Sequence, residues 1–493
     1  MSLLGLDIGT SGCKAAAFDQ QGKPLAYAYR EYPLHSPAPG RAELDPEEVW
    51  QAVLYCLGTV AQKTRNSPPR AMAFSSQGEA VIPLDQGGQP LANSIVTFDS
   101  RARQQTRRLR ERIGDDRFFD ITGVNLHSMV TVAKIAWWKD NDPELFSKAR
   151  QFLCFPDFVL QRLGLPPSLD PSMAARTGGY HQRRGEWSEE VLEALHLDPR
   201  TLPSVAASGS VLGRLGRKGG ELTGLPEDTL VVSGGHDQCC AALGAGVVEA
   251  GQVLCGLGTV EAFIPVSDQF QTGLGRRGFP CYPHVVPSKR VTAAFNFTGG
   301  VLLRWFRDRF FPDEGDDQGH SYQQMLADLP QEPTSLLVLP YFTMSGTPWF
   351  DDRPRGSIIG LSLETGRSEI VKALIEGLAC EMTLNLQLIA EAGLDPSRPR
   401  AVGGGTRSPQ ALQIRADVLG RAIEIPQVTE GAALGAALLA GAGAGIYDDL
   451  AAAAAQLVGV ERVVEPDPGR HEFYAAQMQR YRKLYGLIRQ LGD

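Results

Sequence analysis

The stretch LLGLDIGTSGCKAAAFD, residues 3–19, decides the fold of this 493-residue chain. Its apolar residues alternate with small or acidic ones as far as position 8, which is the two-residue period of a strand. The turn Gly9–Gly12 contains two glycines and two hydroxyls, and a second apolar run follows it. The pattern predicts a β-hairpin with Asp7 at its rim and Lys14 on the returning strand.

This hairpin has the chemistry of a phosphate site. The free backbone N–H groups of a tight turn attract an anion, and Thr10, Ser11 and Lys14 add two hydroxyls and a cation. The Asp7 carboxylate suits a hydrated Mg²⁺ ion. The alternative is an ordinary hairpin whose Asp7 and Thr10 satisfy hydrogen bonds of the turn. Because the stretch lacks the form GxxxxGK[ST], a P-loop nucleotidase is not indicated.

Composition favours a soluble globular protein with two large domains, because 493 residues exceed what one compact core holds. The formal net charge of −8 argues against nucleic acid or an anionic membrane as the main partner. The N-terminus has no cationic region of the kind that begins a signal peptide. Residues 432–447, the longest apolar run, are too few to span a membrane. We therefore expect a cytoplasmic protein whose eight cysteines stay reduced.

A second hairpin repeats the first. Residues 252–266, QVLCGLGTVEAFIPV, again place a Gly-Thr turn, Gly258 and Thr259, between two apolar strands. Two such hairpins predict duplicated α/β halves that grip one polyphosphate from opposite sides. We expect the halves to span residues 1–247 and 248–493.

Polar residues follow several other predicted strands. Gln77 and Glu79 follow one strand and Asp99 follows another, so both groups are expected at one cleft. In GGHDQ, residues 234–238, an acid follows a glycine pair between a strand and a helix. Asp237 is therefore a candidate general base, with a helix N-cap as the alternative.

With these motifs in hand, the chain resembles the FGGY carbohydrate kinases of the actin/hexokinase superfold over nearly its whole length. Five segments carry the resemblance in the family's order: LDIGTSGCKA, GGHDQ, CGLGTVEAF, RGSIIGLSLETGRSEIVKALIEG and VGGGTRSPQALQIRADVLG. The resemblance implies an α/β fold of two actin-like, ribonuclease H-like domains around a central cleft for ATP and sugar.

The resemblance also implies roles for single residues. Asp237 would accept the proton of the attacking hydroxyl, and Asp7 would organise Mg²⁺ through water. The implied ATP-binding residues are Thr10, Ser11, Lys14, Gly258, Thr259, Gly404, Gly405 and Thr406. The implied substrate residues are Gln77, Gly78, Glu79, Asp99 and Gln238. A homodimer is the family-level expectation.

The acceptor is open between two classes. Glu79 agrees with glycerol kinases, whereas Asp99 and Arg101 agree with xylulokinases, and the segment DPSMAART resembles glycerol kinases again. The prediction is transfer of the γ-phosphoryl group of ATP to a small ketose or polyol, with D-xylulose first and glycerol, ribulose or fuculose as alternatives. A non-catalytic sugar sensor is the competing reading, and the presence of both Asp7 and Asp237 argues against it. A chaperone-like ATPase is the other competing class, and the sequence pattern predicts no third, peptide-binding domain after the second half.

Overall fold

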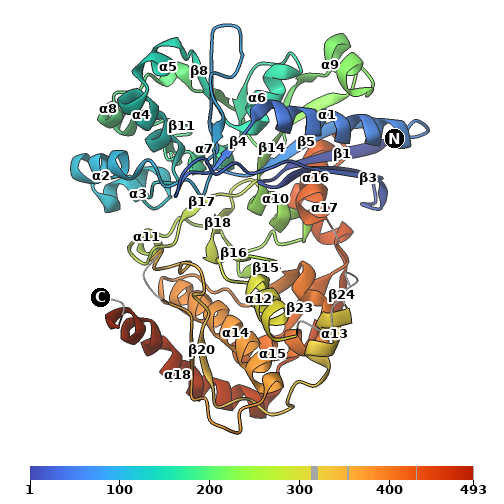
Figure 1. Ribbon diagram of the computed structural model, residues 1–493. Coiled ribbons are helices and arrows are strands. Elements are labelled where there is room, and N and C mark those ends of the chain that lie inside the picture. Colours follow the sequence, from blue (N-terminus) through green and yellow to red (C-terminus); the bar gives the residue numbers. More distant parts are fainter. Residues whose placement is uncertain (312–319, 352–354, 429, 492–493) are drawn as a thin grey trace.

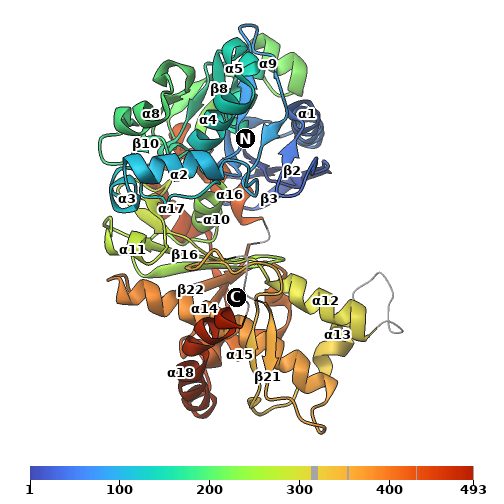
Figure 2. The same cartoon turned by 60° about the vertical axis from the view of Figure 1, so that its left-hand side comes forward.

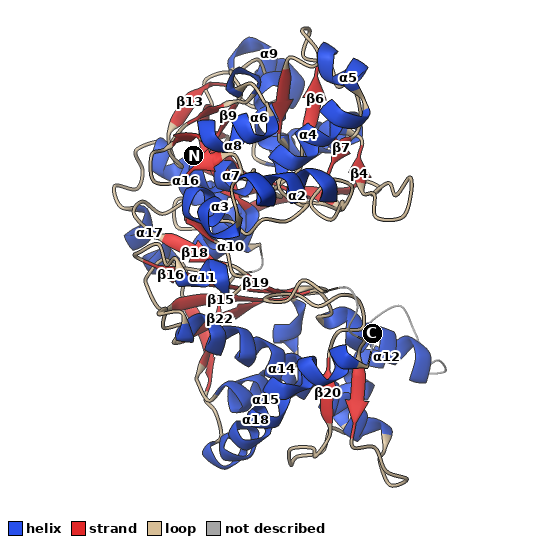
Figure 3. Ribbon diagram, turned by 90° about the vertical axis from the view of Figure 1, so that its left-hand side faces the viewer, coloured by secondary structure: helices blue, strands red, loops and turns tan. Residues whose placement is uncertain are grey.

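The computed structural model describes residues 1–311, 320–351, 355–428 and 430–491. Figure 1 shows two α/β halves, the N-terminal one above in blue to green and the C-terminal one below in yellow to red. In each half, helices surround a central sheet (Figure 3). The strands β15 and β22 of the lower sheet face the upper half.

The first sheet contains the predicted hairpin. Its strands, in spatial order, are β13 (Val211–Arg214), β14 (Leu230–His236), β5 (Pro69–Ser76), β1 (Ser2–Ile8), β2 (Gly12–Phe18) and β3 (Pro24–Glu31). β1 pairs antiparallel with β2 and parallel with β5, and Asp7 lies opposite Lys14. β5 and β14 are also parallel. The carboxyl ends of β1, β5 and β14 therefore meet at one edge of the sheet.

The second sheet repeats this topology. Its strands are β17 (Cys281–Pro283), β18 (Arg290–Thr292), β16 (Glu261–Ser267), β15 (Gln252–Leu257), β22 (Arg398–Val402), β23 (Ile423–Pro426) and β24 (Val460–Val464), with β19 (Ala294–Asn296) on β16. β15 and β16 form the second predicted hairpin. β15, β22 and β23 are parallel, and β24 is an antiparallel edge like β13. The predicted duplication is thus confirmed in the strand order and directions.

The helices and short strand pairs complete each half. The N-terminal helices are α1 (Pro46–Lys63), α2 (Arg103–Arg112), α3 (Asp115–Thr122), α4 (Thr131–Asn141), α5 (Pro143–Lys148), α6 (Phe155–Arg162), α7 (Pro171–Arg176), α8 (Glu189–Leu195), η1 (Pro199–Thr201), α9 (Gly216–Thr223) and α10 (Asp237–Gly244). The later helices are α11 (Gly273–Arg276), α12 (Gly300–Phe310), α13 (His320–Ala327), α14 (Arg367–Glu391), η3 (Gly404–Arg407), α15 (Pro409–Leu419), α16 (Gly431–Gly443), α17 (Leu450–Leu457) and α18 (Pro468–Gln490). The two-stranded pairs are β4 (Glu43–Leu44) with β7 (Ser94–Ile95), β6 (Ile82–Leu84) with β8 (Gln151–Leu153), β9 (Ser168–Leu169) with β12 (Ser204–Val205), β10 (Tyr180–His181) with β11 (Glu186–Trp187), and β20 (Leu337–Leu339) with β21 (Ser357–Ile359).

Helix α16 joins the two halves. It belongs to the C-terminal half by sequence, yet it packs against β1, β5, β14 and α10 of the N-terminal half. Figure 1 and Figure 2 both show it in orange-red beside the blue strands. Glycines permit this contact, because a Cβ atom on Gly5 would lie 1.8 Å from the carbonyl oxygen of Ala433. The division at residues 247 and 248 stays a prediction, and α16 lies on the far side of it from its packing partners.

Helix α14 is the long core helix of the C-terminal half. Its length and composition alone would let it cross a membrane, and the same holds for no other helix among the described residues. However, 83% of its most apolar window is buried inside the fold. Such extensive burial identifies α14 as a core helix of the fold.

Candidate active site

Asp7 lies near the end of β1, beside the turn of the first hairpin. The Ser75 hydroxyl, at the end of β5, donates a hydrogen bond of 2.8 Å to Asp7 Oδ1. Burial raises the pKa of Asp7, and the hydrogen bond and Lys14 act against that rise. Lys14 Nζ lies 3.0 Å from Glu430 Oε2, at the start of α16. The hairpin therefore presents a carboxylate and a cation at the boundary between the halves.

Asp237 is the first residue of α10 and directly follows β14. The N-cap is His236, so the alternative of Asp237 as the N-cap is wrong. Three residues before Asp237, glycine is required at position 234, since a Cβ atom there would lie 1.7 Å from the carbonyl oxygen of Phe74. Within the described part of the chain, Asp237 Oδ1 is buried and accepts no hydrogen bond. A buried acceptor oxygen without a donor suits a carboxylate whose hydrogen bonds are completed only when a ligand binds.

The electrostatics of Asp237 also suit a general base. Burial chiefly raises its pKa to about 7, and the nearby Asp7 carboxylate adds to this rise. The backbone N–H and side chain of Gln238 act in the opposite direction. A base whose pKa lies close to neutral combines availability with proton affinity.

The turn of the second hairpin and the glycine motif are neighbours, because they follow the paired parallel strands β15 and β22. Gly258 and Thr259 are exposed at the end of β15. Gly403 has a φ of 97° and lies so close to β15 that a Cβ atom would be 2.9 Å from the Leu257 carbonyl oxygen. Gly404, Gly405 and Thr406, the predicted nucleoside residues, follow it in the turn η3, where the Thr406 hydroxyl donates to the Gly403 carbonyl oxygen at 2.8 Å. The fold thus brings both predicted C-terminal ATP motifs together.

Gln77 and Gly78 follow β5 and touch parts of the site. The Gln77 side chain donates to the Gly9 carbonyl oxygen at 3.0 Å and accepts from the Thr10 hydroxyl at 3.1 Å. It therefore ties the end of β5 to the turn of the first hairpin. Gly78 packs against the His236 ring. Their contact with a substrate stays a prediction.

Glu79 and Asp99 are buried and have partners within the protein. The Glu79 carboxylate forms an ion pair with Arg176 and accepts from the Thr97 hydroxyl at 3.2 Å. Asp99 accepts two hydrogen bonds from the Arg101 side chain at its Oδ2 oxygen, at 3.0 and 2.7 Å. Direct contact of either carboxylate with an acceptor sugar stays a prediction, and it would require these oxygens to share their present bonds.

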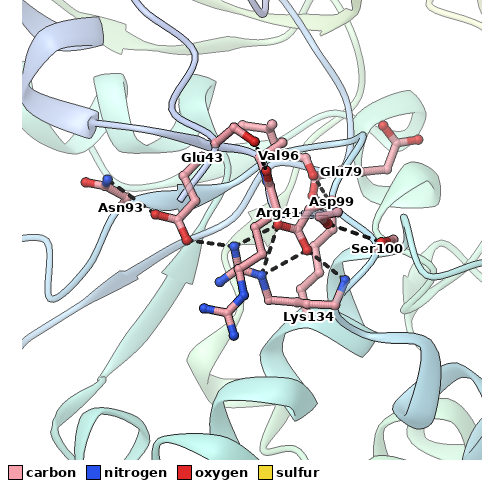
Figure 4. Close-up of polar contacts among 12 residues, drawn as sticks. Arg41, Glu43, Glu79, Asn93, Val96, Asp99, Ser100 and Lys134 are labelled. Carbon is pink, nitrogen blue, oxygen red and sulfur yellow. Dashed lines mark hydrogen bonds and ion pairs between the residues drawn. The ribbon is translucent and has the colours of Figure 1, made fainter. Parts of the chain in front are cut away.

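Lys134 links the chain segments that carry these two acids, and the sequence analysis missed this residue. Its buried Nζ donates to the carbonyl oxygens of Glu79 and Val96, both at 2.9 Å (Figure 4). Burial lowers its pKa to about 8. Because Lys134 lies on α4, between 38 and 55 residues away from its partners, no local pattern could have revealed it. The segments that carry Glu79 and Asp99 thus share one buried lysine, and their position at a common cleft stays a prediction.

Asp7 fits a magnesium ion that is held mainly by water and phosphate. No group of three or more possible metal ligands occurs among the residues that the structure describes. Asp7 uses one oxygen for Ser75, and no described residue donates a hydrogen bond to the other. One free carboxylate oxygen beside a phosphate-binding turn matches the way that Mg²⁺ is bound with few protein ligands.

A cavity of about 560 Å³ lies elsewhere, between α3 on one side and α11, α14 and residues 348–349 on the other. Its walls include Asp116, Arg277 and Trp349, and none of the predicted site residues. We place the candidate active site at the two hairpins and Asp237, because these residues carry the predicted phosphate-binding and proton-accepting groups.

Two similar α/β halves with Gly-Thr hairpins and an acid after a buried strand are the features of a phosphotransferase. The sequence model of the FGGY family of carbohydrate kinases, N-terminal domain, matches residues 2–244. The model of the C-terminal domain of the same family matches residues 280–444. The chain therefore belongs to the FGGY family of carbohydrate kinases, as the resemblance predicted.

Individual relatives align over almost the whole chain. Xylulose kinase of Bacillus subtilis is 29% identical over 99% of this chain and 96% of its own length. Autoinducer-2 kinase of Escherichia coli K12 is 30% identical over 98% of this chain and 94% of its own. The crystal structure of xylulose kinase from Rhodospirillum rubrum superposes with a TM-score of 0.91, at 26% identity over 100% of this chain and 99% of that one. The two actin-like domains are thereby confirmed, and the chain is a phosphotransferase with an alcohol group as acceptor.

The pKa of Asp237 predicts a pH profile. A base acts only when it is unprotonated, so kcat/KM for the acceptor should fall as the pH drops through about 7. The measurement is kcat/KM between about pH 5.5 and 8.5 at constant, saturating Mg²⁺. A profile that stays flat over this range would remove Asp237 from the role of base.

Lys14 should act on ATP. Replacing Lys14 by Ala is expected to raise KM for ATP about tenfold or more, because a charged hydrogen bond to phosphate is lost. Glu430→Gln is the matched control: it removes the present partner of Lys14, so KM for ATP should stay unchanged or fall. Equal KM values for ATP in Lys14→Ala and the unaltered enzyme would exclude Lys14 from the phosphate site.

Proposed function

We propose that this carbohydrate kinase transfers the γ-phosphoryl group of ATP to a hydroxyl of a small ketose, with D-xylulose as the first candidate. The observation that carries the catalytic part is the partly exposed Asp237 carboxylate, whose buried Oδ1 lacks a hydrogen-bond donor among the described residues. Whole-length similarity to xylulose kinases supports the choice of acceptor. We also propose that the enzyme acts in the cytoplasm.

In this mechanism, the Asp237 carboxylate accepts the proton of the attacking hydroxyl as the new O–P bond forms and the bond to ADP breaks. The turns at residues 9–12 and 258–259 hold the phosphates through their N–H groups, and Lys14 neutralises charge. A magnesium ion near Asp7 would supply further neutralisation of the phosphate oxygens. Such a transition state needs position and charge neutralisation more than covalent chemistry.

The acceptor side is rich in fixed polar groups. Two ion pairs lie there: Asp99 with Arg101, and Glu79 with Arg176 at the end of α7. Carboxylates and guanidinium groups together can accept from and donate to several hydroxyls of one sugar. We infer an acceptor with several hydroxyls, a class that includes both ketoses and short polyols; the similarity to xylulose kinases favours the ketose.

Autoinducer-2 kinases give a second candidate, since one is 30% identical over nearly the whole chain. Its acceptor, autoinducer-2, belongs in the same test. Glycerol and the other short polyols are the remaining alternatives, and Glu79 is the residue that favours them.

The decisive experiment is a coupled ADP-release assay with Mg²⁺ and ATP against D-xylulose, D-ribulose, L-fuculose, glycerol, erythritol and autoinducer-2. We expect D-xylulose to raise ADP release well above the rate without acceptor. Higher kcat/KM with another compound would replace the acceptor but keep the reaction. No response to any compound, with ATP still bound, would favour the sugar-sensor reading.

A further inference from the structure

A buried aromatic and basic cluster surrounds the Asp237 carboxylate. His236 Nε2 lies 3.2 Å from Asp237 Oδ1, although the contact is not aligned as a hydrogen bond. On the other side of the ring, the Tyr282 hydroxyl lies 3.2 Å from His236 Nδ1. The two rings meet edge to face, with centroids 5.7 Å apart. His236 thus stands between a tyrosine hydroxyl and the proposed base.

The surroundings fix the imidazole. The backbone N–H of His236 donates to the Ser172 hydroxyl oxygen at 2.9 Å. A Cβ atom on Gly78 would lie 3.0 Å from His236 Cδ2 and 3.1 Å from Nε2, so glycine leaves just enough room for the ring. The Arg176 guanidinium lies 5.2 Å from the centre of the Tyr282 ring.

The Tyr282 hydroxyl can donate to Nδ1 or accept from it, and the Asp237 carboxylate oxygen beside Nε2 favours the proton on Nε2. Burial, and after it the Arg176 charge, lowers the pKa of His236 well below its usual value, so the ring is neutral. Burial keeps Tyr282 protonated by raising its pKa. A neutral imidazole has one donor and one acceptor nitrogen. If the Tyr282 hydroxyl donates to Nδ1, the remaining N–H is on Nε2, the nitrogen that faces Asp237.

We propose that His236 is a positioning residue for Asp237, and that Tyr282 holds its imidazole in the tautomer with the proton on Nε2. When the acceptor enters, a small rotation aligns Nε2–H with Oδ1 and leaves the other carboxylate oxygen to take the hydroxyl proton. Hydrogen bonds at catalytic groups are often poorly aligned before the substrate binds. His236 stays neutral throughout, and the transferred proton resides on Asp237.

Tyr282 gives this arrangement a second consequence. It lies on β17 of the second sheet, whereas His236 ends β14 of the first. The hydroxyl that orients the imidazole therefore comes from the other half of the protein. The inference rests on the proposed role of Asp237 as the base, so its test needs one readout that does not depend on turnover.

That readout is the tautomer itself. With ¹⁵N-labelled histidine, the shifts of the two ring nitrogens of His236 are measured by NMR in the full-length protein, assigned by loss of the signal in His236→Gln. We expect an acceptor-type Nδ1 and a protonated Nε2, and a mixture of tautomers in Tyr282→Phe. A wild-type ring protonated on Nδ1 would overturn the proposal, whatever the acceptor of the enzyme proves to be.

Kinetics supply the second test, with the acceptor found in the panel. A glutamine amide nitrogen reaches the place of Nε2, whereas an asparagine amide nitrogen reaches only that of Nδ1. We expect His236→Gln to keep kcat within about threefold and His236→Asn to lower it about tenfold to a hundredfold, with both KM values nearly unchanged. Equal losses in the two variants, or unchanged kcat in His236→Asn, would overturn the positioning role. Tyr282→Phe, which keeps the ring, should lower kcat without lowering the melting temperature; wild-type kcat there would remove Tyr282.

Discussion

Asp237→Asn should lower kcat by a factor of about one hundred or more while the protein still folds and binds ATP. The amide has the size of the carboxylate but cannot take the proton of the acceptor hydroxyl. Folding should tolerate the change, because Oδ1 has no hydrogen-bond donor to lose among the described residues. A neutral amide is also cheaper to bury than a carboxylate. The measurements are kcat from ADP release, ATP affinity and the melting temperature.

Asp157→Asn is the matched control. Asp157, in the first turn of α6, is fully buried, and neither of its oxygens has a hydrogen-bond partner in the described part of the chain. Burial raises its pKa well above the usual range, so a neutral amide suits this site. Its replacement should leave kcat within about twofold. Near-wild-type kcat in Asp237→Asn would refute the assignment of the base.

Gly435→Ala should destabilise the protein strongly. A Cβ atom there would lie 1.9 Å from the carbonyl oxygen of Cys240, which belongs to the backbone of α10. Backbone atoms of α10 occupy the place of the new methyl group, and they cannot rotate away as a side chain can. The helices α10 and α16 must therefore separate, which costs about 3 kcal/mol or more. Activity should fall as well, because α10 begins with Asp237. Chemical denaturation and kcat of the soluble fraction measure the two effects.

Gly486→Ala serves as the control for this change. Gly486 lies inside α18, and nothing stands within 4 Å of the place of its Cβ atom. Alanine there should be neutral, or stabilise the protein by up to about 1 kcal/mol through its helix propensity. Similar stability in Gly435→Ala and the unaltered protein would mean that the crossing of α10 and α16 is looser than described.

The sequence by itself determined the local chemistry of this protein. Both Gly-Thr hairpins were predictable, because strand alternation and turn glycines are encoded within about fifteen residues. The duplicated halves followed from the repetition of that pattern. Asp237 could be singled out for the same reason, since the strand, glycine pair and acid are consecutive in the chain.

Only the tertiary structure decided which side chains meet. Glu79 pairs with Arg176 and accepts a hydrogen bond from Lys134, and His236 contacts Tyr282. These contacts depend on the packing of helices and strands that are far apart in the chain. The placement of α16 on the first sheet was likewise hidden, because its alanines and glycines suit close packing against any backbone. Local patterns report backbone conformation and polarity, whereas partners across the cleft depend on the order of strands and on how closely two helices cross. For that reason the two Gly-Thr turns and the place of Asp237 between a strand and a helix could be predicted from the sequence, and the charged cluster of Glu79, Arg176 and Lys134 could not.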